Sequence, residues 1–299
     1  MPNKNRATLI GLVAIVLWSS IVGLIRSVSD HLGPTGGAAM MYSVASVFLL
    51  LTVGGARPRE LRAFPPRYLL WGSLLFVAYE LCLALSIGYA NTAQQAIEVG
   101  MVNYLWPTFT IVAAIVFNRQ QANWLIAPGF VLSIVGIGWV LGGEQGFDLP
   151  GMWRNVQDNP LSYGLALAGA LIWAGYCTVT ARIANGKNGV TPFFILVSLV
   201  LWAKYLLQGD ASGASMDFNL SAIVYLLLAA GAMGFGYAAW NVGILHGNVT
   251  VLAGASYFIP VLSSALSVWL LGAALSWAFW QGAAMVCGGA ILCWLATRR

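Results

Sequence analysis

Charged side chains are scarce in this 299-residue chain, and their scarcity limits what the protein can be. Only 8% of its residues are charged, against about 25% in soluble domains, whereas 60% are hydrophobic. So few charges cannot cover the surface of a soluble fold, and the surroundings must therefore be largely lipid. The net charge of +5 is spread between apolar segments rather than gathered in a solvated basic patch, which argues against nucleic-acid binding.

Cysteine and histidine are also rare. A disulfide framework or a zinc site would need paired spacings in polar loops, but all four cysteines fall in apolar segments, where they are expected to act as small core hydrophobes: Cys82, Cys177, Cys287 and Cys293. His31 and His246 are expected near span ends on opposite sides of the membrane, which argues against a shared metal. There is no phosphate loop and no H-E-x-x-H motif. We expect neither a metal nor a cofactor.

The chain contains instead a series of long apolar segments. A transmembrane helix needs roughly 20 such residues, and breaks at polar, Gly or Pro positions delimit ten segments: 7–28, 36–53, 67–89, 93–117, 122–142, 160–183, 191–208, 219–245, 248–271 and 275–297. The first segment is longer than the hydrophobic region of a typical signal peptide, so we interpret it as a membrane span. The sequence therefore predicts an all-α membrane protein with ten transmembrane helices.

The positions of Lys and Arg predict the orientation of these helices. With the N-terminus inside the cell, the inner connections hold eleven Lys and Arg residues and the outer ones only Arg26 and Arg154. Acidic residues have the opposite bias, because six, including Asp210, lie in outer connections and only Glu60 in an inner one. This bias follows the positive-inside rule. With an even number of spans, both termini are predicted to be cytoplasmic.

An internal repeat divides the chain into two halves. A shift of 153 residues places Tyr104–Pro107 on Tyr257–Pro260, Trp124 on Trp277, Gly129 on Gly282 and Gly136 on Gly289, and a shift of 155 places Leu17–Trp18 on Ile172–Trp173. Two tandem units of five helices must enter the membrane from opposite sides. We predict two inverted five-helix repeats, at 1–142 and 160–299, joined by an outer loop at 143–159. Inverted repeats characterise transporters with a binding site near the midplane.

These features resemble a known group of transporters. Ten helices in two halves, Trp18 and Trp173 in the matching first helices, and Pro107 and Pro260 late in the matching fourth helices resemble the drug/metabolite transporter superfamily. Within it, the stretch from Glu98 to Pro107, EVGMVNYLWP, is similar to that of the bacterial aromatic amino acid exporters. The resemblance implies outward transport of small metabolites across the bacterial inner membrane.

Two carboxylates lie within the predicted spans. A charge at the centre of the bilayer costs about 2.5–3.5 kcal/mol or more, so such residues usually face a protein interior or a cavity. Glu80 is predicted near the middle of the third helix, where it could pair with a substrate ammonium group, carry a proton, or form a hydrogen bond between helices. Glu98 is nearer the outer end of the fourth helix, and the sequence leaves its role open.

Aromatic residues gather on single helix faces near the middle of several spans. Trp173, Tyr176 and Cys177 share a face of the sixth helix, and Tyr237 and Trp240 share one of the eighth. Aromatic residues at span ends usually mark the membrane interface, but those in the middle of a span are expected to line a cavity. Our predicted substrate-binding residues are Trp18, Tyr79, Glu80, Asn103, Tyr104, Trp106, Trp173 and Tyr237.

The fourth helix is expected to be distorted. Tyr104 and Trp106 point about 160° apart on an ideal helix, so both can reach one cavity only if the helix is irregular near Pro107. Pro107 and Pro260 each remove one backbone hydrogen bond, which frees the carbonyl groups of Asn103 and Ser256. Because the two prolines match between the halves, we predict that both serve as hinges.

The predicted function is export of aromatic and other neutral or apolar amino acids by alternating access, with protons as an optional coupling ion. The substrate ring would stack on Trp and Tyr, and its ammonium group would meet Glu80, freed carbonyls or ring faces. One alternative is export of other small metabolites or cationic drugs, which would depend on a mid-membrane acid such as Glu80. A membrane-embedded enzyme is a more remote alternative, because it needs catalytic groups at one depth.

Overall fold

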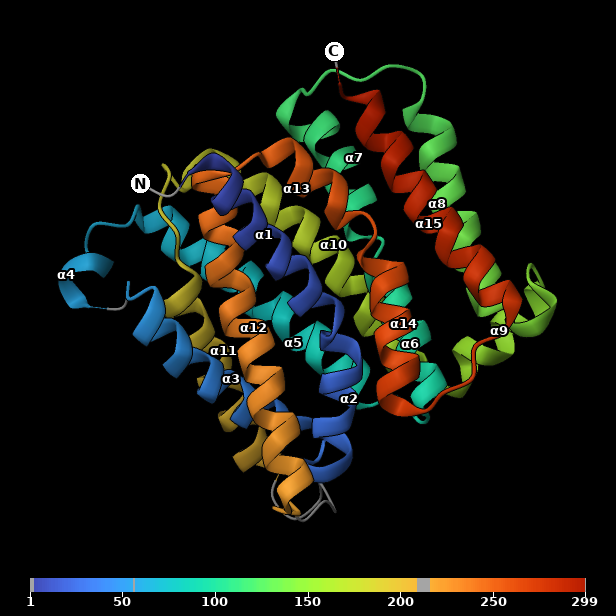
Figure 1. Ribbon diagram of the computed structural model, residues 1–299, viewed down its shortest axis with the longest axis horizontal. Helices are drawn as coiled ribbons and strands as arrows, with labels where there is room; N and C mark the ends of the chain where they lie inside the picture. Colours follow the sequence, from blue (N-terminus) through green and yellow to red (C-terminus); the bar gives the residue numbers. More distant parts are fainter. Residues whose placement is uncertain (1–2, 56, 209–215, 299) are drawn as a thin grey trace.

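The computed structural model describes residues 3–55, 57–208 and 216–298, and all its regular elements are helical. Asp210 and Arg299, which contribute to the predicted orientation, lie outside these residues. The helices are α1 (Lys4–Ser19), α2 (Ile21–Leu32), α3 (Pro34–Thr52), α4 (Pro58–Leu61), α5 (Ser73–Gly88), α6 (Ala93–Asn103), α7 (Trp106–Asn118), α8 (Ile126–Leu141), α9 (Leu149–Asp158), α10 (Pro160–Ile183), α11 (Val190–Gln208), α12 (Leu220–His246), α13 (Val249–Ser256), α14 (Ile259–Leu271) and α15 (Trp277–Ala296), with a π-helical turn η1 (Tyr68–Gly72) and a 3-10 turn η2 (Gly143–Gln145) (Figure 1).

Each predicted apolar segment is helical, with ends close to those expected from the sequence. The segment predicted at 160–183 coincides with α10, whose first turn begins at Pro160 and whose N-cap is Asn159. The Asn159 side chain accepts a hydrogen bond from the Ser162 amide at 3.1 Å, which satisfies one amide of the first turn. Among the described residues, seven helices are long and apolar enough to cross a membrane, or eight if α1 and α2 form one bent span.

The first predicted segment is bent, which its apolar pattern did not predict. The axes of α1 and α2 differ by 42° across Ser20. Ser19 donates its hydroxyl to the Ile15 carbonyl and Ser20 donates to the Leu17 carbonyl, each at 2.7 Å. Serine side chains that bond back to the preceding turn bend helices, so this adjacent pair explains the kink without a proline.

The fourth and ninth predicted segments are interrupted at matching positions. The break after Asn103 separates α6 from α7, and the break after Ser256 separates α13 from α14. A shift of 153 residues superimposes the ends of α6 and α13 and both bounds of α7 and α14. The helix-ending residues also match, because Arg119 and Gly272 both have left-handed backbone conformations, with φ of 54° and 63°.

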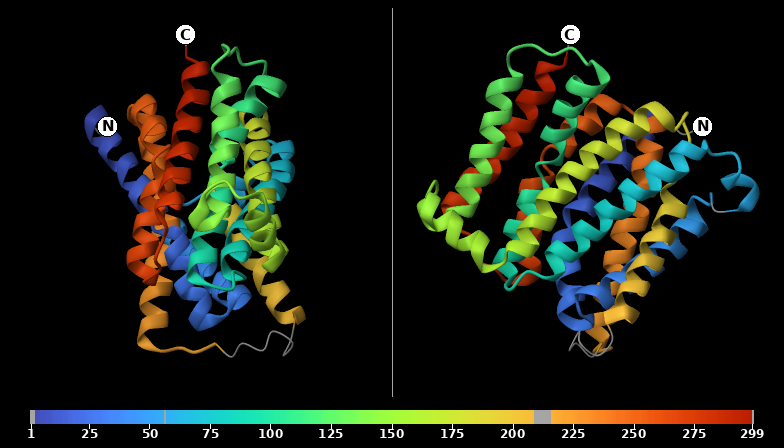
Figure 2. Two further views of the ribbon diagram at one scale, coloured as in Figure 1. Left: turned by 90° about the vertical axis from the view of Figure 1, so that its right-hand side faces the viewer. Right: turned by 180° about the vertical axis from the view of Figure 1, so that it is seen from behind.

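The helices pack in pairs that join the N-terminal and C-terminal parts of the chain. α1 packs on α12 and α10 on α5, whereas α3 packs on α11 and α8 on α15. In Figure 1 the α8–α15 pair forms one side of the molecule, and α3, α11 and α12 lie toward the other. The start of α1 and the end of α15 lie at the same end of the molecule, as both views in Figure 2 show.

Glycine allows α8 and α15 to approach closely. A Cβ atom on Gly136 would lie 2.9 Å from the Gly282 carbonyl oxygen, and one on Gly289 would lie 2.6 Å from the Gly129 carbonyl oxygen. The two contacts are equivalent in the repeat, because the shift of 153 residues places Gly129 on Gly282 and Gly136 on Gly289. Small residues allow such backbone contact between membrane helices.

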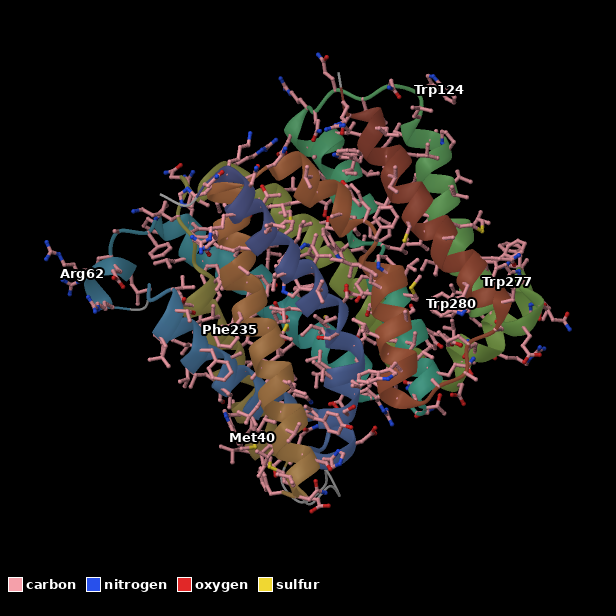
Figure 3. All side chains as sticks on the ribbon, viewed as in Figure 1. Met40, Arg62, Trp124, Phe235, Trp277 and Trp280 are labelled. Atoms are coloured by element: carbon pink, nitrogen blue, oxygen red, sulfur yellow. The ribbon has the colours of Figure 1, made fainter. Side chains whose placement is uncertain are left out.

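The outer surface of the bundle is apolar. Large side chains such as Leu51 and Leu207 are 80% and 87% exposed, which is costly in water but not in lipid. Trp124 and Trp277 lie at opposite ends of the α8–α15 pair, where they are suited to the two membrane interfaces (Figure 3). Arg62, beside the short helix α4, lies at the periphery of the molecule in the same view.

Candidate binding cavity

A cavity of about 210 Å³ lies between helices from both parts of the chain. Among the described residues, fourteen line it, of which seven are aromatic and none is charged: Trp18, Ile21, Val22, Tyr79, Leu83, Asn103, Tyr104, Trp106, Trp173, Cys177, Met233, Tyr237, Trp240 and Ile259. Such a largely apolar space with a few polar atoms is suited to a small molecule that has an aromatic or aliphatic side chain.

The cavity contains seven of the eight residues predicted to bind substrate. Trp18 comes from α1, Tyr79 from α5, Trp173 from α10 and Tyr237 from α12. Asn103, Tyr104 and Trp106 come from the junction of α6 and α7. Glu80 does not line the cavity.

The interruption between α6 and α7 brings both aromatic residues of this junction to the cavity. The break lies at Tyr104 and Leu105, as expected near Pro107, and both Tyr104 and Trp106 line the cavity. Asn103, which is 2% exposed, donates its side-chain amide to the Ala166 carbonyl at 3.3 Å. One N–H and the carbonyl oxygen of the Asn103 side chain thus remain available to a polar ligand.

The aromatic residues around the cavity pack against one another. Trp173 contacts Tyr79 with ring centroids 4.4 Å apart and Trp106 at 6.2 Å in an edge-to-face arrangement. In a second group, Trp18 contacts Tyr237 at 5.1 Å and Trp240 at 5.2 Å. Such contacts stabilise ring positions by about 0.5–1.5 kcal/mol each, so the two groups form preorganised walls on which a substrate ring can stack.

Glu80 lies behind the cavity wall and is 0% exposed. Tyr42 donates its hydroxyl to one carboxyl oxygen of Glu80 at 2.6 Å, and Tyr237 donates to the other at 2.8 Å. A buried carboxyl group needs such partners, because removal from water is costly. Tyr237 thus connects Glu80 with the cavity.

Glu98 lies in a separate polar network. It accepts hydrogen bonds from Gln94 at 3.0 Å, from Asn155 at 2.7 Å and from Tyr163 at 2.8 Å. These donors lie on α6, α9 and α10, so the network ties α6 to the segment that connects the two parts of the chain. Glu98 is 3% exposed and does not line the cavity.

Several cavity residues were not among the predicted site residues. Cys177 and Trp240 share helix faces with Trp173 and Tyr237, which is the signal that could have identified them. Ile259 corresponds to Trp106 under the 153-residue shift, so the repeat could have identified it. The remaining aliphatic lining residues carry no comparable signal: Ile21, Val22, Leu83 and Met233.

The two predicted hinges lie at equivalent places. Pro107 is the second residue of α7, and Pro260 is the second residue of α14. Proline is tolerated in a first turn, where its missing N–H has no helical partner. Both prolines therefore begin a second helical piece next to cavity residues, namely Trp106 in one case and Ile259 in the other.

Comparisons with known proteins identify relatives of this chain. Residues 5–142 match the EamA-like transporter family. Proteins named aromatic amino acid exporter YddG from Escherichia coli K12 and Salmonella typhimurium are 58% and 59% identical over 296 residues, and each match covers 99% of both chains. A protein of the same name from Ancylobacter novellus is 27% identical over 301 residues, with 99% of this chain and 100% of the relative covered.

The fold has also been observed in a solved crystal structure. That structure matches with a TM-score of 0.67 at 22% identity and covers 99% of this chain and 100% of its own. The relatives named above are exporters rather than enzymes, and the apolar helices mark an integral membrane protein. The high identity over nearly the whole length and the matched family profile agree with the resemblance seen in the sequence. The chain therefore belongs to the EamA-like family of drug/metabolite transporters.

Proposed function

We propose that this protein exports aromatic and other neutral or apolar amino acids across the bacterial inner membrane. The observation that carries this proposal is the uncharged, aromatic cavity, which lies in a chain 58–59% identical to proteins named aromatic amino acid exporters. Aromatic walls favour substrates with rings, and the lack of charged lining residues favours substrates without net charge.

The substrate would occupy the cavity with its ring between the two aromatic walls. Its ammonium group would meet ring faces and the side-chain carbonyl of Asn103, because cations are attracted to aromatic faces. Its carboxylate would accept hydrogen bonds from the Asn103 amide and from the hydroxyls of Tyr79 and Tyr104. The proposed binding residues in contact with the cavity are Trp18, Tyr79, Asn103, Tyr104, Trp106, Trp173 and Tyr237.

Transport would proceed by alternating access between two inverted five-helix repeats, at 1–142 and 160–299, in a chain that crosses the membrane ten times. Three observations support this arrangement: the matching breaks of α6–α7 and α13–α14, the reciprocal glycine contacts of α8 and α15, and the common end at which α1 starts and α15 finishes. Pro107 and Pro260 would act as hinges, since both stand where a helix is interrupted beside the cavity.

Export of cationic drugs is less well supported. A cation removed from water needs a carboxylate or a comparable partner. No charged side chain in the described part of the chain lines the cavity, and both oxygens of Glu80 already accept hydrogen bonds. The same observation makes Glu80 an unsuitable partner for a substrate ammonium group in this conformation. Proton coupling would then require a rearrangement that exposes Glu80 or Glu98.

The proposal is tested by flux measurements on purified protein in liposomes. A panel of amino acids should show saturable transport of tryptophan, phenylalanine and tyrosine, little transport of aspartate or lysine, and none of a quaternary ammonium dye. Repeating the assay with and without a proton gradient determines the coupling. If the protein transports the dye but no amino acid, its substrates are cations and the proposal is wrong.

A further inference from the structure

Glu80 has no access to the cavity, yet it is hydrogen-bonded to a residue of the cavity wall. It lies on α5 between Tyr42 of α3 and Tyr237 of α12. Both carboxyl oxygens accept from tyrosine hydroxyls, and Glu80 is fully buried. A substrate in the cavity would therefore meet the ring of Tyr237 and not the carboxyl group behind it.

The ring of Tyr237 is fixed from several sides. Phe194 packs edge-to-face on it with centroids 5.2 Å apart, Phe76 lies at 5.9 Å and Trp18 at 5.1 Å. The hydrogen bond to Glu80 then fixes the orientation of the ring, because it determines where the hydroxyl group lies. Without an acceptor, this hydroxyl would be left unpaired, so the ring would move to find another partner.

Tyr42 makes Glu80 a rigid acceptor. The side chain of Tyr42 is 0% exposed, and its ring packs against Phe194 at 5.4 Å. Phe194 also contacts Tyr237, so Tyr42, Glu80, Tyr237 and Phe194 form a closed ring of contacts among α3, α5, α11 and α12. A displaced carboxyl group would displace the cavity wall.

We propose that Glu80 is a positioning residue: it holds the ring of Tyr237 in the cavity wall and so sets the affinity for aromatic substrates without touching them. This inference rests on the proposed function, because it assumes that aromatic amino acids bind in the cavity. Two roles of the buried Glu80 carboxyl group can thus be distinguished, namely contact with the substrate and positioning of Tyr237. A group that contacts the substrate acts independently of Tyr237, whereas a positioning group acts only through it.

A double-mutant cycle distinguishes these roles, with tryptophan binding to the purified full-length protein in detergent as the measurement. Tyr237→Phe removes the hydroxyl, and Glu80→Met removes the acceptor while keeping a side chain of similar length. Each should weaken binding about tenfold, which corresponds to a loss of about 1.4 kcal/mol. The double variant should be no weaker than either single one, because both changes break the same interaction.

Two further variants serve as controls. Glu80→Gln keeps an amide oxygen that can accept from Tyr237 and should stay within about threefold of the unmodified protein. Tyr163→Phe removes a comparable tyrosine-to-carboxylate bond, at Glu98 rather than at the cavity, and should leave tryptophan affinity unchanged. If Glu80→Met fails to fold, Tyr42→Phe takes its place in the cycle, because it removes the second hydrogen bond that holds the Glu80 carboxyl group. Tyr42→Phe should weaken tryptophan binding in the unmodified protein and have no further effect in the Tyr237→Phe variant.

The outcomes separate this inference from the proposed function. If the unmodified protein binds no aromatic amino acid, the proposed function fails. If it binds tryptophan but the effects of Glu80→Met and Tyr237→Phe add up, Glu80 acts on the substrate independently and the positioning role is wrong. If Glu80→Gln weakens binding as much as Glu80→Met does, the positioning role is also wrong. Affinity would then depend on the charge of Glu80 and not on its ability to accept a hydrogen bond.

Discussion

Gly236 determines where Trp18 lies, which gives a sharp test of the cavity as a substrate site. A Cβ atom on Gly236 would lie 2.7 Å from the indole nitrogen of Trp18 and 2.9 Å from its Cδ1 atom, whereas ordinary contacts are 3.4–4 Å. Gly236→Ala must therefore displace the indole by at least about 0.7 Å. The ring also contacts Tyr237 and Trp240 and lines the cavity, so its displacement changes the shape of the cavity wall.

The expected size follows from the cost of overpacking. Inserting a methyl group into a well-packed site costs about 1–3 kcal/mol, and the smaller value already weakens binding severalfold. In a cavity of about 210 Å³, the loss should be greater for the large ring of tryptophan than for that of phenylalanine. We expect Gly236→Ala to reduce tryptophan affinity about tenfold and phenylalanine affinity about threefold.

Equilibrium binding of both amino acids to the purified protein measures this effect. Gly231→Ala on the same helix is the matched control, because its nearest neighbour, Phe235, is 3.6 Å from the added Cβ. Gly231→Ala should bind both amino acids like the unmodified protein. Equal affinities in both alanine variants would refute the reasoning, since Trp18 would then not shape the binding site.

Three further predictions concern other parts of the molecule. Asn103→Ala should weaken binding of tryptophan about tenfold and binding of tryptamine less, as measured by competition, because tryptamine loses only the contact with its ammonium group whereas tryptophan also loses the contact with its carboxylate. Gly289→Ala should lower the melting temperature by several degrees, because the added Cβ would lie 2.6 Å from the Gly129 carbonyl oxygen. The control Gly288→Ala should leave the melting temperature unchanged, because its added Cβ would lie 3.6 Å from the nearest neighbour. Glu98→Gln should also lower the melting temperature, since an amide cannot accept all three hydrogen bonds of that carboxylate, and an unchanged melting curve would contradict this.

Much of this fold could be predicted from the sequence because apolar segments of membrane length dominate it. The predicted segment 160–183 coincides with α10, and 191–208 differs from α11 by one residue. The break near Pro107 was predicted for a physical reason, since Tyr104 and Trp106 cannot face one cavity on a regular helix. The bend at Ser20 was missed, because serine bends a helix only when its hydroxyl bonds back to the preceding turn, which the sequence does not reveal.

The candidate site was predictable where a single residue type carried the signal. Mid-span aromatic residues such as Trp18 and Tyr237 led to the cavity, because rings at that depth lie too far from the membrane interface to anchor there. The position of Glu80 could not be predicted from its neighbour Tyr79. Consecutive residues on a helix point about 100° apart, so only one of the two faces the cavity, and the tertiary packing decides which.

Whether the substrate occupies the aromatic cavity is tested most directly by protection of Cys177, which lines it. In a variant that retains Cys177 but has the other three cysteines replaced by alanine, the rate of maleimide labelling is measured with and without tryptophan. Tryptophan should slow the labelling of Cys177 with a midpoint equal to its binding constant, whereas aspartate should have no effect. Labelling that tryptophan does not slow, in protein that still transports it, would place the substrate elsewhere.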